Sequence, residues 1–452
     1  MPRIQFPDGF VWGAATASYQ IEGAVHADGR GASIWDTFSH TPGTVLNGDT
    51  GDVACDHYHR LDADLDLMVD LGLRAYRFSI AWPRVVPDGT GQVNQAGLDF
   101  YDRLVDGLLE RGITPFATLY HWDLPQALQD RGGWEHRDIV PAFTEYTQAV
   151  VGRLGDRVVR WITHNEPWVV SFLGNYEGVH APGQTDLGAA LSVAHHLLVS
   201  HGAAVPVIRS GSPGGEVGIT VNLGLGRART DAPADMEAVR ALDGYANRWF
   251  LDPLYGKGYP SDMVERFGAA MPAVNDADLD LIATPTDFLG INSYNPSVVR
   301  PTAKADNPLG FDPLTADELT AAGYELTAMG WPIVPEAFGQ LITRVARDYE
   351  VPAIYITENG AAFDDEVVDG RIDDPRRTDF LRRHLAALRV AIDEGAPVRG
   401  YFAWSLMDNF EWALGYARRF GLVHVDYETL ERTPKASAHW YHDTMADNGF
   451  DL

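Results

Sequence analysis

The chain has 452 residues, of which 45% are hydrophobic and 22% are charged, and its formal net charge at pH 7 is −28. This composition is typical of a globular protein, and it excludes disorder or collagen-like repetition as a description of the whole chain. A surface of this charge repels phosphate backbones and anionic lipids, so we expect neither nucleic acid nor a membrane as a partner. A neutral or cationic small molecule fits better as a substrate.

Cysteine content and the apolar stretches indicate the compartment. Cys55 is the only cysteine, which excludes an intrachain disulfide and suits a reducing environment. Residues 1–8 lack the apolar run of a secretory signal. The longest stretch without charged side chains, 187–208, contains three histidines and Pro206, so we predict a buried helix leading into a loop and not a membrane span. We therefore expect a cytoplasmic protein.

Short β-rich runs alternate with amphipathic stretches from one end of the chain to the other. Apolar residues at helical spacing predict helices over 61–68, 98–109, 143–151, 338–349 and 381–392. The Pro- and Asp-rich segment 299–327 is predicted as a loop over the mouth of a cavity. The runs predicted as strands are 10–15, 73–80, 114–120, 158–163, 216–222, 287–292, 353–357 and 398–405.

Strands that alternate with helices indicate a parallel sheet. Eight of them, with no low-complexity linker between them, predict a single (β/α)8 barrel, the TIM barrel, that spans residues 1–452 and has long loops at its C-terminal face. The alternative is a doubly wound open sheet. Such a sheet usually has a Gly-rich turn after its first strand, and the sequence has none there.

Polar and aromatic side chains follow these strands, at the end of the barrel where such folds place their chemistry. Glu166 in Thr163-His-Asn-Glu-Pro167 and Glu358 in Ile356-Thr-Glu-Asn-Gly360 stand out. Two carboxylates that face each other across a pocket are the minimum needed to cleave a glycosidic bond. A lone glutamate after a strand is more often a helix-terminal charge or a salt-bridge partner, so spacing alone leaves both interpretations open.

The segments around these glutamates resemble the signature motifs of glycoside hydrolase family 1, which contains the β-glucosidases. The two motifs are Asn165-Glu166-Pro167 and Thr357-Glu358-Asn359-Gly360. The resemblance implies a TIM barrel and a retaining β-glycosidase, a β-glucosidase acting on short β-glucosides without metal or cofactor. It extends nearly end to end through further blocks at 10–23, 76–84, 120–125, 178–183, 404–412 and 419–426.

The resemblance also implies roles for individual residues. Glu166 is expected to be the acid/base and Glu358 the nucleophile, about 5–5.5 Å apart as retention of configuration requires. An ionised Glu358 would raise the pKa of Glu166, and Arg77 and Tyr294 would support the nucleophile. Trp168, His180 and Trp331 are candidates for the leaving-group side. The implied substrate-binding residues are Gln20, His121, Trp122, Asn165, Asn292, Tyr294, Trp331, Trp404, Glu411, Trp412 and Phe420.

Other chemistries have little support in the sequence. The two histidines of Cys55-Asp-His-Tyr-His59 would not share a helix face, and no phosphate-binding, dinucleotide-binding or serine-hydrolase motif occurs. One rival function is a 6-phospho-β-glycosidase, against which the negative charge of Glu411 argues. The other is a catalytically silent carbohydrate-binding protein, against which the two intact glutamates argue. The preferred sugar epimer, the chain length of the substrate and the oligomeric state stay open.

Overall fold

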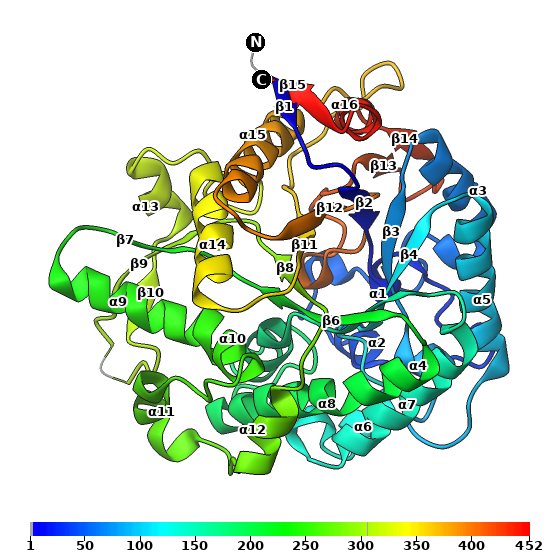
Figure 1. The fold of residues 1–452 in the computed structure, drawn as a ribbon. Coiled ribbons are helices and arrows are strands. Elements are labelled where there is room, and N and C mark those ends of the chain that lie inside the picture. Colours follow the sequence, from blue (N-terminus) through cyan, green and yellow to red (C-terminus); the bar gives the residue numbers. More distant parts are fainter. Residues whose placement is uncertain (1–2, 305) are drawn as a thin grey trace.

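Eight parallel strands close into a barrel in the computed structural model, which describes residues 3–304 and 306–452 (Figure 1). The strand order is β11-β12-β2-β3-β4-β5-β6-β8, and pairing of β8 with β11 closes the sheet. The predicted TIM barrel is thereby confirmed, with β5 showing the largest displacement from its predicted range. The strands are β2 (Val11–Ala15), β3 (Ala75–Ser79), β4 (Thr114–Tyr120), β5 (Arg160–Asn165), β6 (Glu216–Asn222), β8 (Phe288–Asn292), β11 (Ile354–Asn359) and β12 (Val398–Trp404).

Helices surround the barrel and cover its outer face (Figure 1). Each presents an apolar stripe to the strands: in α5 (Gln95–Glu110), Leu98, Tyr101 and Leu104 are buried at helical spacing while the acidic side chains face outward. The predicted helical stripes therefore pack where their periodicity places them. The other large helices are α3 (His57–Asp70), α7 (Ile139–Leu154), α8 (Leu187–Gly211), α14 (Pro335–Asp348), α15 (Pro375–Asp393) and α16 (Ala436–Ala446).

The apolar stretch predicted as a buried helix forms α8. By length and composition α8 could cross a membrane, but 72% of its apolar window is buried inside the protein, where it packs against α7 and α12 (Asp276–Ile282). The expected loop near its end was wrong, because the helix continues through Pro206 to Gly211. Burial of Val205 and Ile208 provides the tertiary packing that outweighs the poor helix propensity of proline.

The connection from β6 to β8 is long and carries structure of its own. It holds β7 (Gly226–Ala228), α9 (Pro233–Asp243), α10 (Trp249–Leu254), α11 (Ser261–Phe267) and α12. Beyond β8, the prediction of a loop over 299–327 was wrong. This segment contains the end of β9 (Ser297–Pro301), β10 (Phe311–Pro313) and α13 (Ala316–Ala321), with β10 and β7 paired to opposite edges of β9.

The two ends of the chain meet outside the barrel (Figure 1). There β1 (Arg3–Gln5) pairs antiparallel with β15 (Gly449–Asp451), next to α16. Near the barrel mouth β13 (Val423–Val425) pairs with β14 (Arg432–Pro434). Met1 and Pro2, which belong to the segment in which no secretory signal is expected, lie outside the described residues.

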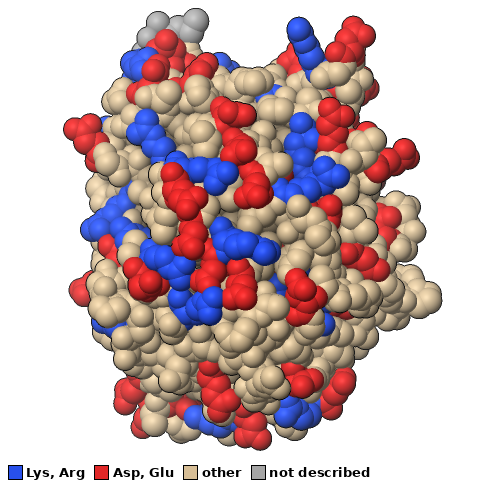
Figure 2. Space-filling view, turned by 90° about the vertical axis from the view of Figure 1, so that its right-hand side faces the viewer, with Lys and Arg blue, Asp and Glu red and all other residues tan. Residues whose placement is uncertain are grey.

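Acidic and basic side chains interleave on the surface over α3 and α5 (Figure 2). Arg153 of α7 contacts Asp99 and Asp102 of α5, and Arg157 contacts Asp102 at 2.8 Å and Asp106 at 2.6 Å. These ion pairs offset part of the repulsion among acidic groups that the net charge of −28 creates.

A close approach between α8 and the chain at Leu281 gives a stability prediction. A Cβ at Gly202 would lie 1.9 Å from the backbone oxygen of Leu281, whereas a Cβ at Gly152 on exposed α7 surface would meet nothing within 4 Å. We expect Gly202→Ala to lower the free energy of unfolding by about 1–3 kcal/mol through overpacking. The control Gly152→Ala should raise it by up to about 1 kcal/mol through helix propensity. Guanidinium unfolding measures both, and equal stabilities of the two variants would contradict the packing argument.

Candidate active site

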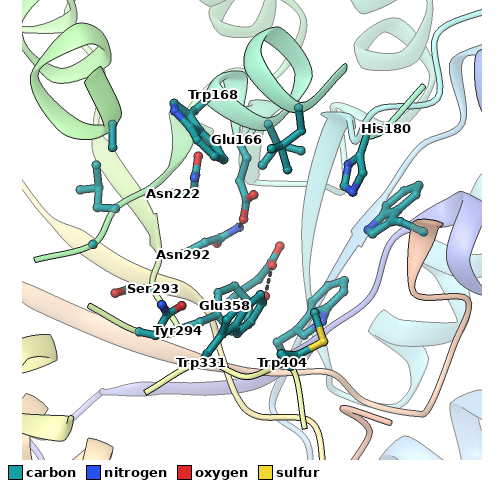
Figure 3. Close-up of a pocket in the computed structure, with 18 of the residues that line it drawn as sticks. Glu166, Trp168, His180, Asn222, Asn292, Ser293, Tyr294, Trp331, Glu358 and Trp404 are labelled. Atoms are coloured by element: carbon teal, nitrogen blue, oxygen red, sulfur yellow. Dashed lines mark hydrogen bonds between the residues drawn. The ribbon is translucent and has the colours of Figure 1, made fainter. Parts of the chain in front are cut away.

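A cavity of about 470 Å³ opens at the C-terminal ends of the barrel strands (Figure 3). This volume suits a small ligand. Three predicted residues, Gln20, Arg77 and Asn165, are fully buried and are not among the residues that line the cavity. The other predicted site residues all line it: His121, Trp122, Glu166, Asn292, Tyr294, Trp331, Glu358, Trp404, Glu411, Trp412 and Phe420, together with Trp168 and His180.

Glu166 and Glu358 reach into this cavity from opposite sides (Figure 3). Glu358 lies within β11, and Glu166 directly follows β5. Glu166 has a backbone φ of 50°, in the left-handed region that non-glycine residues seldom adopt. Such strain persists only where the surroundings enforce it. Here Glu166 donates its backbone N–H to the Thr220 oxygen at 2.9 Å, which fixes the turn out of the strand.

The carboxylate of Glu358 receives a donor on each oxygen. Arg77, from β3, contacts Oε1, and the Tyr294 hydroxyl donates to Oε2 at 2.5 Å. Burial raises the pKa of Glu358, while the Arg77 guanidinium and the Tyr294 hydrogen bond pull that pKa back down. These two contacts favour the ionised form of Glu358.

Glu166 has the opposite environment. Burial, with the nearby negative charge of Glu358, raises the pKa of Glu166 to about 8, although a hydrogen bond from Asn292 to Oε1 opposes the shift. Two close carboxyl groups in a buried site cannot both ionise easily, so the pair holds one proton at neutral pH. Because two donors favour the ionised form of Glu358, the proton belongs on Glu166.

A chain of amides fixes the orientation of His121. Asn165 Oδ1 accepts from Arg77 Nη2 at 2.5 Å and from Asn292 Nδ2 at 3.0 Å, so Asn165 Nδ2 faces His121 Nε2 at 3.0 Å. Burial, together with the charge of Arg77, holds the pKa of His121 well below its usual range, and the ring is neutral. Since Nε2 accepts, Nδ1 carries the hydrogen, and this buried donor has no partner within the protein.

Acceptors complement this donor. Gln20 donates both amide hydrogens, to Asn409 Oδ1 at 3.0 Å and to the Phe410 oxygen at 2.9 Å, which leaves its Oε1 unpaired. Glu411 Oε2 is also buried without a partner, and burial together with the charge of Glu358 raises the pKa of Glu411 to about 8. Unpaired buried polar groups are costly unless a ligand satisfies them.

Two indole rings add flat apolar surface beside these polar groups. The His121 ring is nearly parallel to the rings of Trp404 and Trp412, with centroid distances of 6.0 and 6.1 Å and interplanar angles of 19° and 18°. A wall that combines ring faces with unpaired donors and acceptors suits a ligand that carries several hydroxyl groups on an apolar frame.

The cavity lining also contains residues that were not predicted from the sequence. Asn222 ends β6, so the rule that found the other strand-end residues could have found it too. The apolar lining residues have no such signal, because their sequence context is that of ordinary core residues. They include Val169, Leu173, Leu242, Ala246, Met329 and Leu414.

The segment Cys55–His59 forms contacts within the protein. His57 Nδ1 lies 2.8 Å from Asp64 and His59 Nδ1 lies 2.6 Å from Asp56. Across residues 3–304 and 306–452, no group of three or more His, Cys, Asp or Glu side chains is arranged to hold a metal ion.

The sequence motifs and the site geometry agree with comparisons to known proteins. The model of glycosyl hydrolase family 1 matches residues 2–450. The chain belongs to this family. It is 49% identical to Beta-glucosidase A of Thermotoga maritima, with 99% of each chain covered, and 47% identical to Beta-glucosidase A of Acetivibrio thermocellus, with 100% of each covered.

Solved structures of the family share the fold over the whole length. The family 1 β-glucosidase from Thermotoga maritima superposes with a TM-score of 0.96 at 48% identity, covering 100% of both chains. A second structure is of a family 1 glycoside hydrolase from the same organism, in complex with a cyclophellitol analogue described as a transition state mimic. It superposes with a TM-score of 0.96 at 48% identity, covering 99% of this chain and 100% of that chain.

The raised pKa of Glu411 predicts that the folded protein loses stability as the pH rises. Its pKa rises from 4.5 to about 8 on folding, so the folded state binds the proton more tightly, and stability falls as pH rises across that interval. We expect Glu411→Gln to raise the thermal midpoint at pH 8.5 and to leave it nearly unchanged at pH 5. Thermal unfolding at the two pH values measures this, and an equal effect at both would contradict the shift.

Proposed function

We propose that the protein is a retaining β-glucosidase, which releases terminal, non-reducing β-D-glucosyl residues from short β-glucosides. The observation that carries this proposal is the pair of carboxyl groups across one cavity, with the proton favoured on Glu166 and the negative charge on Glu358. The similar curated proteins named as β-glucosidases support the same activity.

In the first step the Glu358 carboxylate attacks the anomeric carbon of the bound sugar. The bond from that carbon to the leaving oxygen breaks, and the proton of Glu166 goes to this oxygen. The products are a free alcohol, an ester between Glu358 and the sugar, and an ionised Glu166. Tyr294 and Arg77 hold the carboxylate of Glu358 in place until it reacts.

In the second step Glu166 works as a base. Esterification removes the negative charge of Glu358, which had raised the pKa of Glu166, and that pKa falls. Glu166 then takes a proton from a water molecule, whose oxygen attacks the anomeric carbon from the side that the leaving group occupied. The ester bond breaks, Glu358 regains its charge, and glucose leaves with the β configuration retained.

The sugar is recognised by the polar groups that the protein leaves unpaired. His121 Nδ1 donates to a hydroxyl group, while Gln20 Oε1 and Glu411 Oε2 accept. Binding the sugar satisfies these buried atoms, so an analogue without the matching hydroxyl leaves one of them unpaired and binds less well. Trp404 and Trp412 provide ring faces for the apolar C–H groups of the sugar.

The composition of the cavity disfavours a 6-phospho substrate. No lysine or arginine is among the described residues that line it, whereas three glutamates are. A phosphate would enter a site without a cation to pair it.

A carbohydrate-binding protein without catalysis would not need two buried carboxyl groups, one protonated and one ionised, because burying them costs free energy.

The direct test is hydrolysis of nitrophenyl β-D-glucoside, with its 6-phosphate and nitrophenyl β-D-galactoside as comparisons. Proton NMR during the first turnovers should show β-glucose before mutarotation. Preferential hydrolysis of the 6-phosphate would replace the proposal by its phospho-glycosidase rival. Sugar binding without release of glucose from any β-glucoside would favour the carbohydrate-binding protein.

Replacing the two glutamates should separate their roles. We expect Glu358→Ala to reduce kcat by at least about 10⁴-fold, because the carboxylate that forms the ester is absent. Azide should restore turnover and yield the α-glucosyl azide. Glu166→Ala should retain more activity on dinitrophenyl glucoside, whose leaving group needs no proton, and azide should give the β-glucosyl azide. A β-azide from Glu358→Ala would contradict the assignment.

The pH profile should show the titration of Glu166. We expect kcat/KM for an alkyl glucoside to fall above pH about 8, where the acid loses its proton. With dinitrophenyl glucoside and the Glu166→Gln variant this alkaline limb should disappear. An unchanged alkaline limb in that variant would assign it to another group, of which Glu411 is the first candidate.

A further inference from the structure

A cluster of buried charges lies beside the cavity and outside its lining. Three of its members are cationic and three are anionic, so the cluster has no net charge. Five of the six side chains are at most 2% exposed, and Arg419 is 23% exposed. We call this group the ion cluster; it consists of Asp365, Asp374, Arg377, Asp408, Arg419 and Lys435.

Lys435 is the central cation of the ion cluster. Its Nζ donates to Asp365 Oδ2 at 2.6 Å and to Asp408 Oδ1 at 2.7 Å. Arg377 donates to both oxygens of Asp365, at 3.0 and 2.9 Å. Arg419 donates to Asp408 Oδ2 at 2.7 Å. Asp365 and Asp408 each contact two cations. Asp374 contacts Arg377 and accepts the Ser437 backbone N–H, so the orientation of every carboxylate in the cluster is fixed.

The ion cluster joins three segments that end at the cavity wall. Asp365 follows Glu358 by seven residues, and Arg419 immediately precedes Phe420. Asp408 lies in the segment 405–411, between Trp404 and Trp412. On the outer side, Arg377 is on α15, and Lys435 directly precedes α16. The charges thus anchor the rim of the cavity to two helices of the outer layer.

Further hydrogen bonds connect Asp408 to Gln20, whose Oε1 is one of the unpaired acceptors. Asp408 also accepts the Gly421 N–H at 2.9 Å, which fixes the segment 405–411 against its neighbour. The next residue, Asn409, donates to Ser405 Oγ at 3.0 Å and accepts from Gln20 at 3.0 Å. It is this hydrogen bond, with the one to Phe410, that leaves Gln20 Oε1 free. Glu411 ends the same segment.

We propose that Lys435 is a positioning residue that, through Asp408, sets the segment 405–411 and with it the acceptors Gln20 Oε1 and Glu411 Oε2 against the hydroxyl groups of the substrate. This inference rests on the proposed function. Burying paired charges contributes little to stability, because desolvation offsets most of the attraction, but it does enforce one geometry.

The choice of lysine at this position supports a geometric role. Only three of the 35 basic residues are lysines, and the other two, Lys257 and Lys304, are exposed. A compact ammonium group reaches two carboxylates at once, whereas a guanidinium group presents its donors in a wider planar fork. Arginine, which the chain uses almost everywhere else, would push Asp408 away from its place.

The test compares two substrates in a charge-balanced variant. Lys435→Met with Asp365→Asn removes one charge of each sign and leaves Asp408 paired with Arg419 and Asp374 paired with Arg377. The substrates are nitrophenyl β-D-glucoside and its 6-deoxy analogue, which lacks the hydroxyl that the charge argument against a 6-phospho substrate puts beside Glu411. Removing the 6-hydroxyl leaves a buried acceptor of Glu411 unpaired, which corresponds to a factor of about 10 to 100 in kcat/KM, and we expect this preference in the wild type.

In the double variant the preference for the hydroxylated substrate should fall at least about threefold, since the acceptor is no longer held in place. Lys435→Arg keeps the charge, and as a second variant it should show a reduction of the same kind. Arg137→Met is the matched control: it removes the arginine partner of the buried Asp278, outside the cavity lining, and should lower stability without changing the ratio. Circular dichroism establishes which variants fold.

Folded cluster variants that keep the wild-type ratio would overturn the positioning role, even if their thermal midpoints fall. An Arg137→Met variant that changes the ratio as much as the cluster variants would overturn it too, because general destabilisation would then explain the effect. Wild-type protein that hydrolyses neither glucoside would refute the proposed function itself, a result distinct from both.

Discussion

A guanidinium group buried at the mouth of the barrel determines most of the site. Arg77 is 0% exposed and cannot discharge itself by losing a proton, so its charge must be paired within the protein. It contacts Glu358 on one side and Asn165 on the other. The first contact favours the negative charge on Glu358. The second orients Asn165, which in turn fixes the tautomer of His121.

The carboxyl groups in the cavity form one electrostatic unit. The charge of Glu358 raises the pKa of both Glu166 and Glu411, so any step that neutralises Glu358 makes both of them stronger acids. The acid that protonates the leaving group becomes a base through this coupling, without movement of the chain. The same coupling improves Glu411 as a hydrogen-bond acceptor while the sugar is bound covalently. Stability is the cost, as in many sites built from buried ionisable groups.

The barrel could be predicted because its strands are buried on both faces and read as continuous β-rich runs between amphipathic helices. Short elements could not be predicted: β10 has three residues and α13 has six, too few for a hydrophobic period to show among prolines and aspartates. It also ended α8 too early, since the burial that maintains the helix past Pro206 is a tertiary effect.

The site could be predicted as a set of residues but not as an arrangement. Strand-end position and motif resemblance predicted the residues of the site, but they could not predict that Gln20, Arg77 and Asn165 are fully buried and are not among the residues that line the cavity. The orientation of the Asn165 amide depends on hydrogen bonds to residues that come from several strands of the barrel. Apolar lining residues such as Leu173 and Met329 cannot be told from core residues in the sequence.

The scarcity of lysine has a practical consequence for attaching this protein to surfaces or dyes. Lys435 is enclosed by carboxylates, so amine-reactive reagents in the folded state will find only the side chains of Lys257 and Lys304 among the lysines. Labels on lysine side chains should therefore be confined to these two positions. Because no lysine is among the described residues that line the cavity, covalent coupling should spare the chemistry inside it.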